Sequence, residues 1–271
     1  MFSEAAKTPQ MKLAMVQPRV TTALKMDLNG QLRASILAQH LPYPSTTFLN
    51  SLITARSPPP PLPSLVATAK ARLLAADITN STLINTASLQ SLPPDADSPE
   101  SRERRLPRPV HVQVLDVENI SLSRWEQVEE MEAVARGETT RGREVVRVTA
   151  EDDDNPETQQ TQQRPTTAAA ANARTASKKA THRLVLQDCK GVKLYALELK
   201  RIDGIGVGKT QIGEKMLLKA GALLARGVIL LEPEKCVLLG GKIEAWQKTW
   251  ADGRLARLKE EIRQNEQQQA S

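Results

Sequence analysis

The chain has 271 residues, a formal net charge of +6 and 40% hydrophobic residues, but its aromatic content is only 3%. This length allows one or two domains. The shortage of aromatic rings argues against a generic single-strand nucleic-acid binder, because such proteins stack bases on aromatic side chains. The basic charge suits a protein that works near nucleic acid, and it suits a solvated surface equally well.

The remaining composition excludes several classes of site. Cys189 and Cys236 each lie in an apolar run without metal-ligand spacing, so we expect two buried free thiols in a reducing compartment. The three histidines are scattered, and we expect neither a metal site nor a cofactor. No apolar run is long enough to span a bilayer and no secretory signal opens the chain, which predicts a soluble intracellular protein.

Residues 1–92 are predicted to form a small helical unit. Apolar residues recur at helical spacing over 23–40 and 45–56, and Ser45 is suited to cap the second helix. The prolines of 58–63 predict a polyproline spacer. A third helix is expected after it, with Ser64 as its cap and a buried stripe of small and aliphatic residues: Leu65, Val66, Ala69, Leu73 and Ala76.

The middle of the chain predicts one strand followed by a long insertion. A polar linker is expected at 93–105, and Val110–Val117 alternates apolar and polar residues as a half-buried strand does. Helical spacing follows near 123–135. From about residue 138 to 180 the pattern is lost in acidic, Gln/Thr and alanine tracts, so we interpret 118–180 as a flexible insertion.

Further strands follow the insertion. His182–Cys189 and Val192–Ile202 flank a Lys-Gly turn and predict a hairpin, and a glycine-rich loop follows at 203–213. Two short apolar runs, 228–231 and 237–239, flank a bend at a proline and end on paired glycines. With the earlier strand these make five strands, which fit an oligonucleotide/oligosaccharide-binding (OB) barrel over 106–241.

The chain ends with a helix predicted over 242–263, whose apolar residues share one side, and with a polar tail, 264–271, that we expect to be disordered. The predicted fold class is therefore α+β. It comprises a small N-terminal helical unit, then a five-stranded OB barrel with a long insertion after its first strand, then a C-terminal helix.

The glycine-rich loop superficially resembles a phosphate-binding loop. Gly208, Lys209 and Thr210 match its end, but Asp203 stands where the first glycine is required, and its carboxylate would repel phosphate. We expect no nucleotide site and no catalytic residues. Nearby, Lys200 and Arg201 could contact the phosphates of a nucleic acid, or they could form the solvent face of a strand end.

The span 182–258 resembles the OB domain of the RecQ-mediated genome instability protein 1 family. The elements that carry the resemblance run from a Gly-x-Lys entry to a strand, through a Pro-containing turn between strands, to a Gly-Gly pair before a helix. They are Gly213–Lys215, Arg226–Leu231, Glu232–Glu234 and Val237–Gly241. Residues 67–79 resemble the family's helical unit, and 106–117 its first strand.

The resemblance implies a non-catalytic nuclear subunit. Members of the family bind a type IA topoisomerase (topoisomerase III) and act with a RecQ helicase to dissolve double Holliday junctions, which protects genome stability. The insertion reaches the topoisomerase gate, which makes Trp125, Val128 and Met131 candidate anchors. The alternative for Trp125 is packing on its own barrel. Gly213 and Lys215 match the family's partner-facing barrel surface.

Two other functions stay open at this stage. The first is an autonomous single-stranded DNA-binding protein, whose affinity would fall steeply with salt and depend on an aromatic residue in the strands. Tyr195 is the aromatic residue in a predicted strand. The second is a nucleotide-hydrolysing enzyme, which would depend on the incomplete loop at 203–210.

Overall fold

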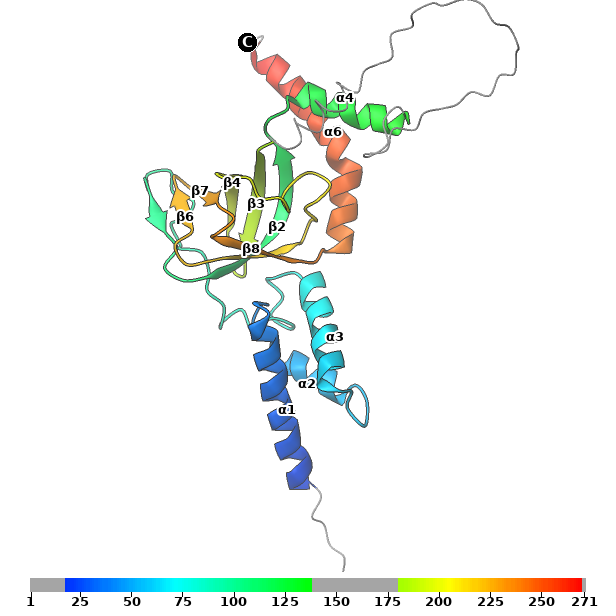
Figure 1. Ribbon diagram of the computed structural model, residues 1–271. Helices are drawn as coiled ribbons and strands as arrows, with labels where there is room; N and C mark the ends of the chain where they lie inside the picture. Colours follow the sequence, from blue (N-terminus) through cyan, green and yellow to red (C-terminus); the bar gives the residue numbers. More distant parts are fainter. Residues whose placement is uncertain (1–17, 138–179, 270–271) are drawn as a thin grey trace, which may run out of the picture. The chain divides into compact units, whose positions relative to one another are not determined.

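The computed structural model describes residues 18–137 and 180–269, and in α1 it describes side chains from residue 28 onward (Figure 1). The chain divides into two units. The first comprises Met1–Leu73 with Thr82–Asn85, and the second comprises Leu74–Ser81 with Thr86–Ser271. The expected α+β class is confirmed, with helices in the first unit and a curled mixed sheet in the second.

The first unit is built from α1 (Pro18–Ala38), α2 (Thr46–Thr54) and most of α3 (Leu62–Ala75). Ser45 caps α2 as predicted, because its Oγ accepts a 3.1 Å hydrogen bond from the backbone N–H of Phe48. The helices meet through apolar side chains at helical spacing, which are buried. These include Leu32, Ile36, Phe48, Leu49, Leu52, Leu65 and Leu73.

The start of α3 differs from the prediction. The carbonyl of Pro61 accepts hydrogen bonds from Ser64 (3.0 Å) and Leu65 (3.1 Å), so the helix begins at Leu62 and Ser64 lies inside its first turn. Pro63 is tolerated there because the first turn of a helix needs no partner for its backbone N–H groups. The end of the polyproline spacer is therefore helical.

The second unit holds one sheet of eight strands in the order β1-β6-β7-β4-β3-β2-β5-β8. Its long strands are β2 (Val110–Asn119), β3 (His182–Asp188) and β4 (Lys193–Glu198). The predicted hairpin is confirmed, because β3 and β4 pair antiparallel. The shorter strands are β1 (Arg104–Arg105), β5 (Lys215–Leu218), β6 (Leu223–Ala225), β7 (Val228–Leu231) and β8 (Cys236–Gly240).

Eight strands make five barrel positions because three of the barrel strands are interrupted. β1 and β2 form the first position, β5 and β6 the fourth, and β7 and β8 the fifth. β7 runs parallel to β4, β6 pairs with β7, and β5 pairs with both β8 and β2, which closes the barrel. The two closing runs are thus one position. The Gly-x-Lys pattern marked the entry to β5, whose four residues are all buried and show no alternation.

The barrel core is aliphatic. An irregularity in the β2–β3 register between Val114 and Asp116 shifts the alternation of β2, so Val117 is buried like Val112 and Val114. The interior includes Val112, Val114, Leu184, Leu186, Leu194, Ala196, Met216, Leu218 and Ile229. Cys189 and Cys236 are both buried and free, as predicted.

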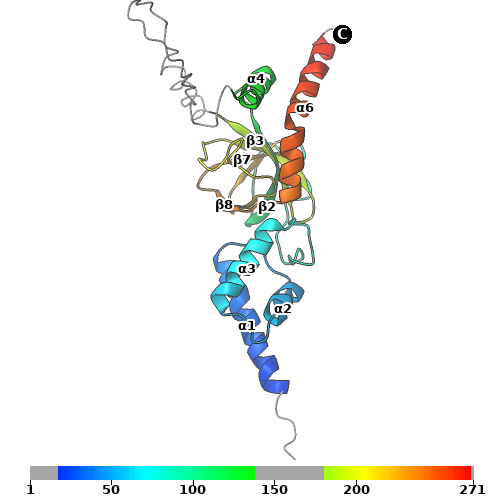
Figure 2. The same cartoon turned by 90° about the vertical axis from the view of Figure 1, so that its right-hand side faces the viewer.

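Three segments around the barrel are more ordered than predicted. The expected linker 93–105 ends in β1, which pairs with β6, and its Ala96 is buried in the core. The C-terminal helix α6 (Glu244–Gln269) continues through most of the expected disordered tail. The start of the insertion is β2 followed by a helix, α4 (Arg124–Ala135), beside α6 (Figure 1, Figure 2). The rest of the expected flexible segment, 138–179, lies outside the described residues.

Candidate functional site

The two ends of the insertion meet at one point of the barrel. Asn119 on β2 stands opposite His182 on β3 in the sheet register. Beyond this pair, the backbone N–H of Ile120 donates to the carbonyl of Thr181 (3.0 Å), and the N–H of Thr181 donates to Ser121 Oγ (2.8 Å). We call these paired residues, 119–121 and 180–182, the neck. The insertion therefore leaves and re-enters the barrel through two segments that are hydrogen-bonded to each other.

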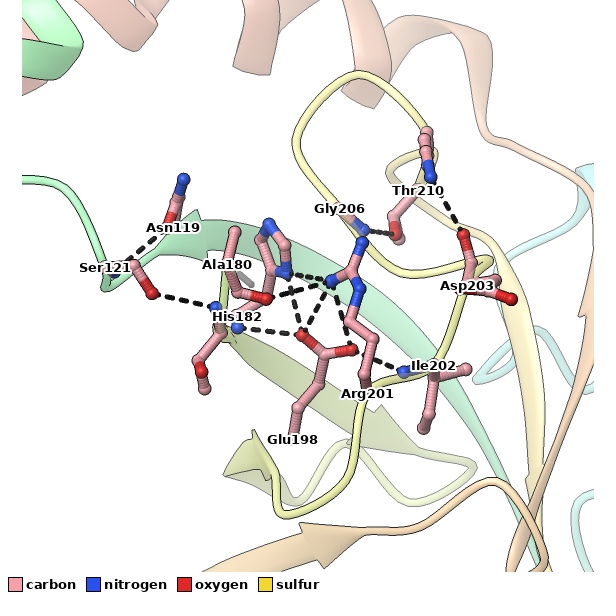
Figure 3. A network of polar contacts seen from close by, with 12 residues as sticks. Asn119, Ser121, Ala180, His182, Glu198, Arg201, Ile202, Asp203, Gly206 and Thr210 are labelled. Atoms are coloured by element: carbon pink, nitrogen blue, oxygen red, sulfur yellow. Dashed lines mark hydrogen bonds and ion pairs between the residues drawn. The ribbon is translucent and has the colours of Figure 1, made fainter. Parts of the chain in front are cut away.

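A buried polar network lies beneath the neck (Figure 3). The carboxylate of Glu198 accepts hydrogen bonds from the backbone N–H of His182 (2.9 Å) and of Ile202 (3.0 Å), and it lies 2.7 Å from His182 Nδ1. Burial alone would raise the pKa of Glu198. The hydrogen bonds from His182 and Ile202 outweigh burial and lower that pKa, so the carboxylate stays ionised.

Arg201 completes this network. Its Nη1 donates to the carbonyl of Ala180 (3.1 Å), lies 3.2 Å from a carboxylate oxygen of Glu198, and lies 2.9 Å from His182 Nδ1. The Nη1 of Arg201 thus fastens the neck, while its side chain is 26% exposed, and a phosphate contact by Arg201 stays a prediction. Its neighbour Lys200 pairs with Glu232 (3.0 Å), and that hydrogen bond raises the pKa of Lys200.

Helix α4 begins on a well-defined cap. Ser123 Oγ accepts from the backbone N–H of Glu126 (3.2 Å), and the Glu126 carboxylate accepts from the N–H of Ser123 (2.7 Å). Arg124 then forms ion pairs with Glu118 of β2 and Glu261 of α6. This first helix of the insertion is therefore held from both sides by the barrel unit.

The three predicted anchors on α4 differ in their environment. Val128 is 4% exposed and packs with Leu258 and Ile262 of α6, and Met131 packs against the same cluster. These two side chains hold α4 to its own chain, and Val128 is too buried to contact a partner. Trp125 is 62% exposed, so the alternative in which it packs on its own barrel is wrong in this structure.

The solvent-facing side of α4 combines this ring with acidic residues. Glu126, Glu129 and Glu130 are exposed, and their helical spacing places them on the same side as Trp125. We call these four residues the outer face of α4. An exposed tryptophan among carboxylates suits a partner surface that offers an apolar pocket with basic residues around it.

Lys215 does not lie on the barrel surface, which corrects the expectation. It is 0% exposed, and its Nζ donates to the carbonyl of Gly213 (2.5 Å) and approaches that of Leu74 (3.4 Å). Burial lowers the pKa of Lys215 to about 8. The lysine of the Gly-x-Lys pattern therefore has a structural role, because at the start of β5 its ammonium group contacts two backbone carbonyls.

Gly213 serves the backbone in the same way. Its φ is +86°, and a Cβ placed there would lie 2.6 Å from the backbone nitrogen of Ile243. Its N–H donates to the carbonyl of Val114 (2.7 Å). Only glycine can both adopt this left-handed conformation and leave room for the backbone of Ile243. Gly213 therefore shapes the barrel rather than presenting a partner contact.

The glycine-rich loop closes on itself. Thr210 Oγ1 accepts from the N–H of Gly206 (3.0 Å), and Lys209 Nζ donates to the carbonyl of Asp203 (3.1 Å). The chain then enters β5 rather than a helix. The groups that would hold a nucleotide in a phosphate-binding loop thus bind their own loop, and the helix N-terminus that such a site uses is replaced by a strand.

Sequence reasoning missed the neck, the network beneath it and the glutamates of the outer face. The neck depends on residues separated by the whole insertion, so spacing gives no signal for it. The capping box at Ser123 and Glu126 was readable and would have fixed the start of α4. Within residues 18–137 and 180–269, no group of three metal-ligating side chains lies together, and no helix there is long and apolar enough to cross a membrane.

Comparisons with known proteins agree with this architecture. Residues 87–254 match the family model described as RMI1, N-terminal OB-fold domain, and residues 36–81 match RMI1, N-terminal helical domain. The chain is 30% identical over 156 residues to RecQ-mediated genome instability protein 1 of Schizosaccharomyces pombe. That match covers 58% of this chain and 65% of the relative's length. The chain belongs to the RMI1 family.

Proposed function

We propose that this chain is a non-catalytic subunit of a RecQ helicase–topoisomerase III complex. It binds the type IA topoisomerase through the OB barrel and the insertion, and it promotes dissolution of double Holliday junctions in the nucleus, which preserves genome stability. Family membership supports the genome-stability role, since the S. pombe relative is named for RecQ-mediated genome instability. The observation that carries the binding mode is the exposed Trp125 on a helix fixed at the base of the insertion.

The neck makes the insertion suitable for binding another protein. A segment that orders on binding loses conformational entropy, which weakens its affinity for a given contact area. Here the first helix is already ordered by its capping box and by packing on α6, and both ends of the insertion are held by the neck. The neck and α4 are therefore already ordered in the free chain, so binding a partner does not require the loss of conformational entropy in these segments.

Trp125 can supply much of the contact energy. Interface tryptophans are frequent hot spots, and truncating one to alanine typically costs about 2 kcal/mol or more. The glutamates of the outer face would act differently, because exposed charges mainly raise the association rate and make it sensitive to salt. Proteins that handle DNA carry basic surfaces, and an acidic face complements them.

The side chains that could act as a nucleophile or a base, two cysteines and a histidine, are buried in the fold. Burial raises the thiol pKa of Cys189 and Cys236, so neither is activated as a nucleophile. His182 is 4% exposed and bound to Glu198. These environments support a binding subunit rather than an enzyme.

The proposal is tested by measuring binding of the purified chain to a type IA topoisomerase by calorimetry. We expect Trp125→Ala to weaken binding about 30-fold, which corresponds to ~2 kcal/mol. Val134→Ala is the matched control, since Val134 is also an exposed apolar residue of α4. Absence of any binding by the unmodified chain would refute the topoisomerase role, whereas equal binding by Trp125→Ala would refute this anchor alone.

Dissolution and localisation need their own tests. Adding the chain to a RecQ helicase and topoisomerase III should increase the yield of non-crossover product from a synthetic double Holliday junction, and Trp125→Ala should lower that increase. A fluorescently tagged chain should accumulate in the nucleus. A yield that does not change with the chain, or a tagged chain excluded from the nucleus, would contradict these parts of the proposal.

A further inference from the structure

The loop that joins α2 to α3 carries a run of four consecutive prolines, Pro58–Pro61, which has no part in the topoisomerase contact proposed above. Ser57 and three of these prolines are exposed, and Pro60 is half-buried. Figure 1 shows the loop projecting beyond the ends of the two helices that it joins. We call Pro58–Pro61 the proline run. The rings of the run are therefore largely open to a partner.

The covalent structure of proline determines how the run is presented. The pyrrolidine ring holds φ near −65°, and a residue that precedes a proline is restricted to extended values of ψ. Pro58, Pro59 and Pro60 each precede another proline, so both restrictions apply to them. Together these restrictions predict one turn of a polyproline II helix, which spans about 9 Å. Since the free chain already holds this shape, binding a partner costs little conformational entropy.

The helices on either side hold the run in place. Before the run, α2 ends at Thr54 and its apolar face is buried. After the run, the carbonyl of Pro61 accepts hydrogen bonds from the backbone N–H groups of Ser64 and Leu65. In contrast, the carbonyls of residues 58–60 accept no backbone hydrogen bond from the described part of the chain. These carbonyls are strong acceptors, so they are open to a partner that carries hydrogen-bond donors.

The chain around the run carries positive charge and no negative charge. The sequence has no Asp or Glu from residue 28 to residue 76. Arg56, which stands two positions before the run, is exposed, and it forms no ion pair with any residue that the structure describes. A protein groove with acidic residues at its rim would therefore complement this part of the helical unit.

Exposed proline rings on a fixed turn suit one mode of recognition. Proline-rich segments in the polyproline II conformation dock in grooves lined by aromatic side chains, as in WW and SH3 domains. The proline rings pack on the aromatic faces, and the polar groups of the groove can donate hydrogen bonds to the free carbonyls. Only one turn is available here, because α3 begins at Leu62. A single turn suits the short groove of a WW domain, whereas an SH3 groove takes a longer segment.

We propose that the proline run is a docking site for a WW domain of a partner protein. Pro58–Pro61 lie across the aromatic rings of the groove, and Arg56 lies beside acidic residues at its rim. The contact is small, so binding is weak, with a Kd on the order of 100 µM. The site does not depend on the proposed topoisomerase contact and goes beyond the proposed function.

The test titrates the full chain into a dye-labelled WW domain that binds oligoproline, and it follows the fluorescence anisotropy of the dye. We expect saturable binding that the double substitution Pro59→Ala with Pro60→Ala weakens about tenfold, because two rings are lost and the backbone is freed. The matched control is Pro93→Ala with Pro94→Ala, the same change at another pair of neighbouring prolines. The control should change the affinity less than about twofold. Replacing the groove tryptophan of the WW domain with alanine should abolish binding.

Each remaining outcome overturns the proposal. No saturable binding with the chain at about 500 µM would do so, because a site with a Kd on the order of 100 µM is mostly occupied at that concentration. Equal losses in the two double variants would show that the contact does not depend on the run. Binding to an SH3 domain but not to the WW domain would assign the run to a different partner. If Pro59→Ala with Pro60→Ala also weakened topoisomerase binding, the run would belong to that contact. Circular dichroism and thermal unfolding of each variant establish that it is folded.

Discussion

Thr181 donates its backbone N–H to Ser121 Oγ at 2.8 Å, although the two residues are 60 positions apart in the chain. The insertion is therefore a loop closed at its base, and what happens inside it need not disturb the barrel. The Glu198 network on the barrel side secures the same point, because Arg201 holds the carbonyl of Ala180. The insertion thus begins with a rigid base that carries an exposed helix, α4.

Substitution Glu198→Gln should destabilise the barrel. The side chain is buried and is the shared acceptor for His182, Arg201 and Ile202, so neutralising it leaves the Arg201 charge without its carboxylate. Breaking a buried pair in this way costs about 3 kcal/mol. Urea unfolding at neutral pH measures the loss, and a change below ~0.5 kcal/mol would show that the network contributes little.

The same carboxylate predicts an acid dependence. The pKa of Glu198 is lowered in the folded chain, so its contribution to stability is fully present above its ordinary pKa of 4.5 and is lost as the pH falls through the lower folded value. The unfolding free energy of the unmodified chain should therefore fall more steeply below pH 4.5 than that of Glu198→Gln. Parallel curves for the two proteins would contradict this assignment.

Lys215 predicts a dependence of stability on pH in the alkaline range. Burial lowers its pKa from 10.5 to about 8, so below pH 8 the folded chain must keep a buried charge. Between pH 8 and 10.5 the folded state loses this proton before the unfolded state does, and stability rises. The interval corresponds to about 3 kcal/mol. Over that range the unfolding free energy of the unmodified chain should rise relative to that of Lys215→Met. A constant difference between the two proteins would exclude a lowered pKa for Lys215.

Gly213→Ala should destabilise the barrel more than Gly240→Ala. Both glycines have positive φ, +86° and +81°, so alanine at either costs about 1 kcal/mol or more in backbone strain. At Gly213 the new methyl also meets Ile243, whereas at Gly240 nothing lies within 4 Å. A comparison of the melting temperatures of the two variants separates the backbone strain from the contact with Ile243. Equal melting temperatures would mean that the contact with Ile243 relaxes freely.

Val128 and Trp125 should respond in opposite ways to truncation. Val128→Ala removes part of the cluster with Leu258 and Ile262 and should weaken α4 packing by about 2 kcal/mol, which hydrogen exchange of the α4 amides would report. Trp125→Ala removes a ring that is mostly in solvent and should leave that exchange unchanged. Faster exchange in Trp125→Ala would mean that the ring packs on its own chain in solution.

Much of the fold was predictable because local patterns and tertiary structure agree. The alternation in β2, the turn between β3 and β4, and the Ser45 cap each encode their element within a few residues. The start of α3 was predicted wrongly because Leu62 lies within a proline run, and the missing N–H groups of proline cost nothing in the first turn of a helix.

The site was harder to predict because its residues come together through the barrel and not through spacing. Helical spacing correctly grouped Val128 and Met131, but it could not say whether the apolar stripe faces α6 or a partner. Lys215 was expected on the partner-facing barrel surface because the Gly-x-Lys pattern matches that of the family, and lysine seldom lies inside a protein. Its burial depends on carbonyls supplied by Gly213 and Leu74, one of them far away in sequence.

Binding through the insertion is tested by replacing residues 122–179 with a short Gly-Ser turn that joins Ser121 to Ala180. In the same variant Leu258 and Ile262 are changed to Gln, so that α6 exposes no new apolar surface. The neck should keep this shortened barrel folded. Calorimetry with a type IA topoisomerase should then show binding lost or weakened at least 100-fold, while the full chain carrying the same two Gln substitutions still binds. Undiminished binding by the shortened barrel would contradict the account.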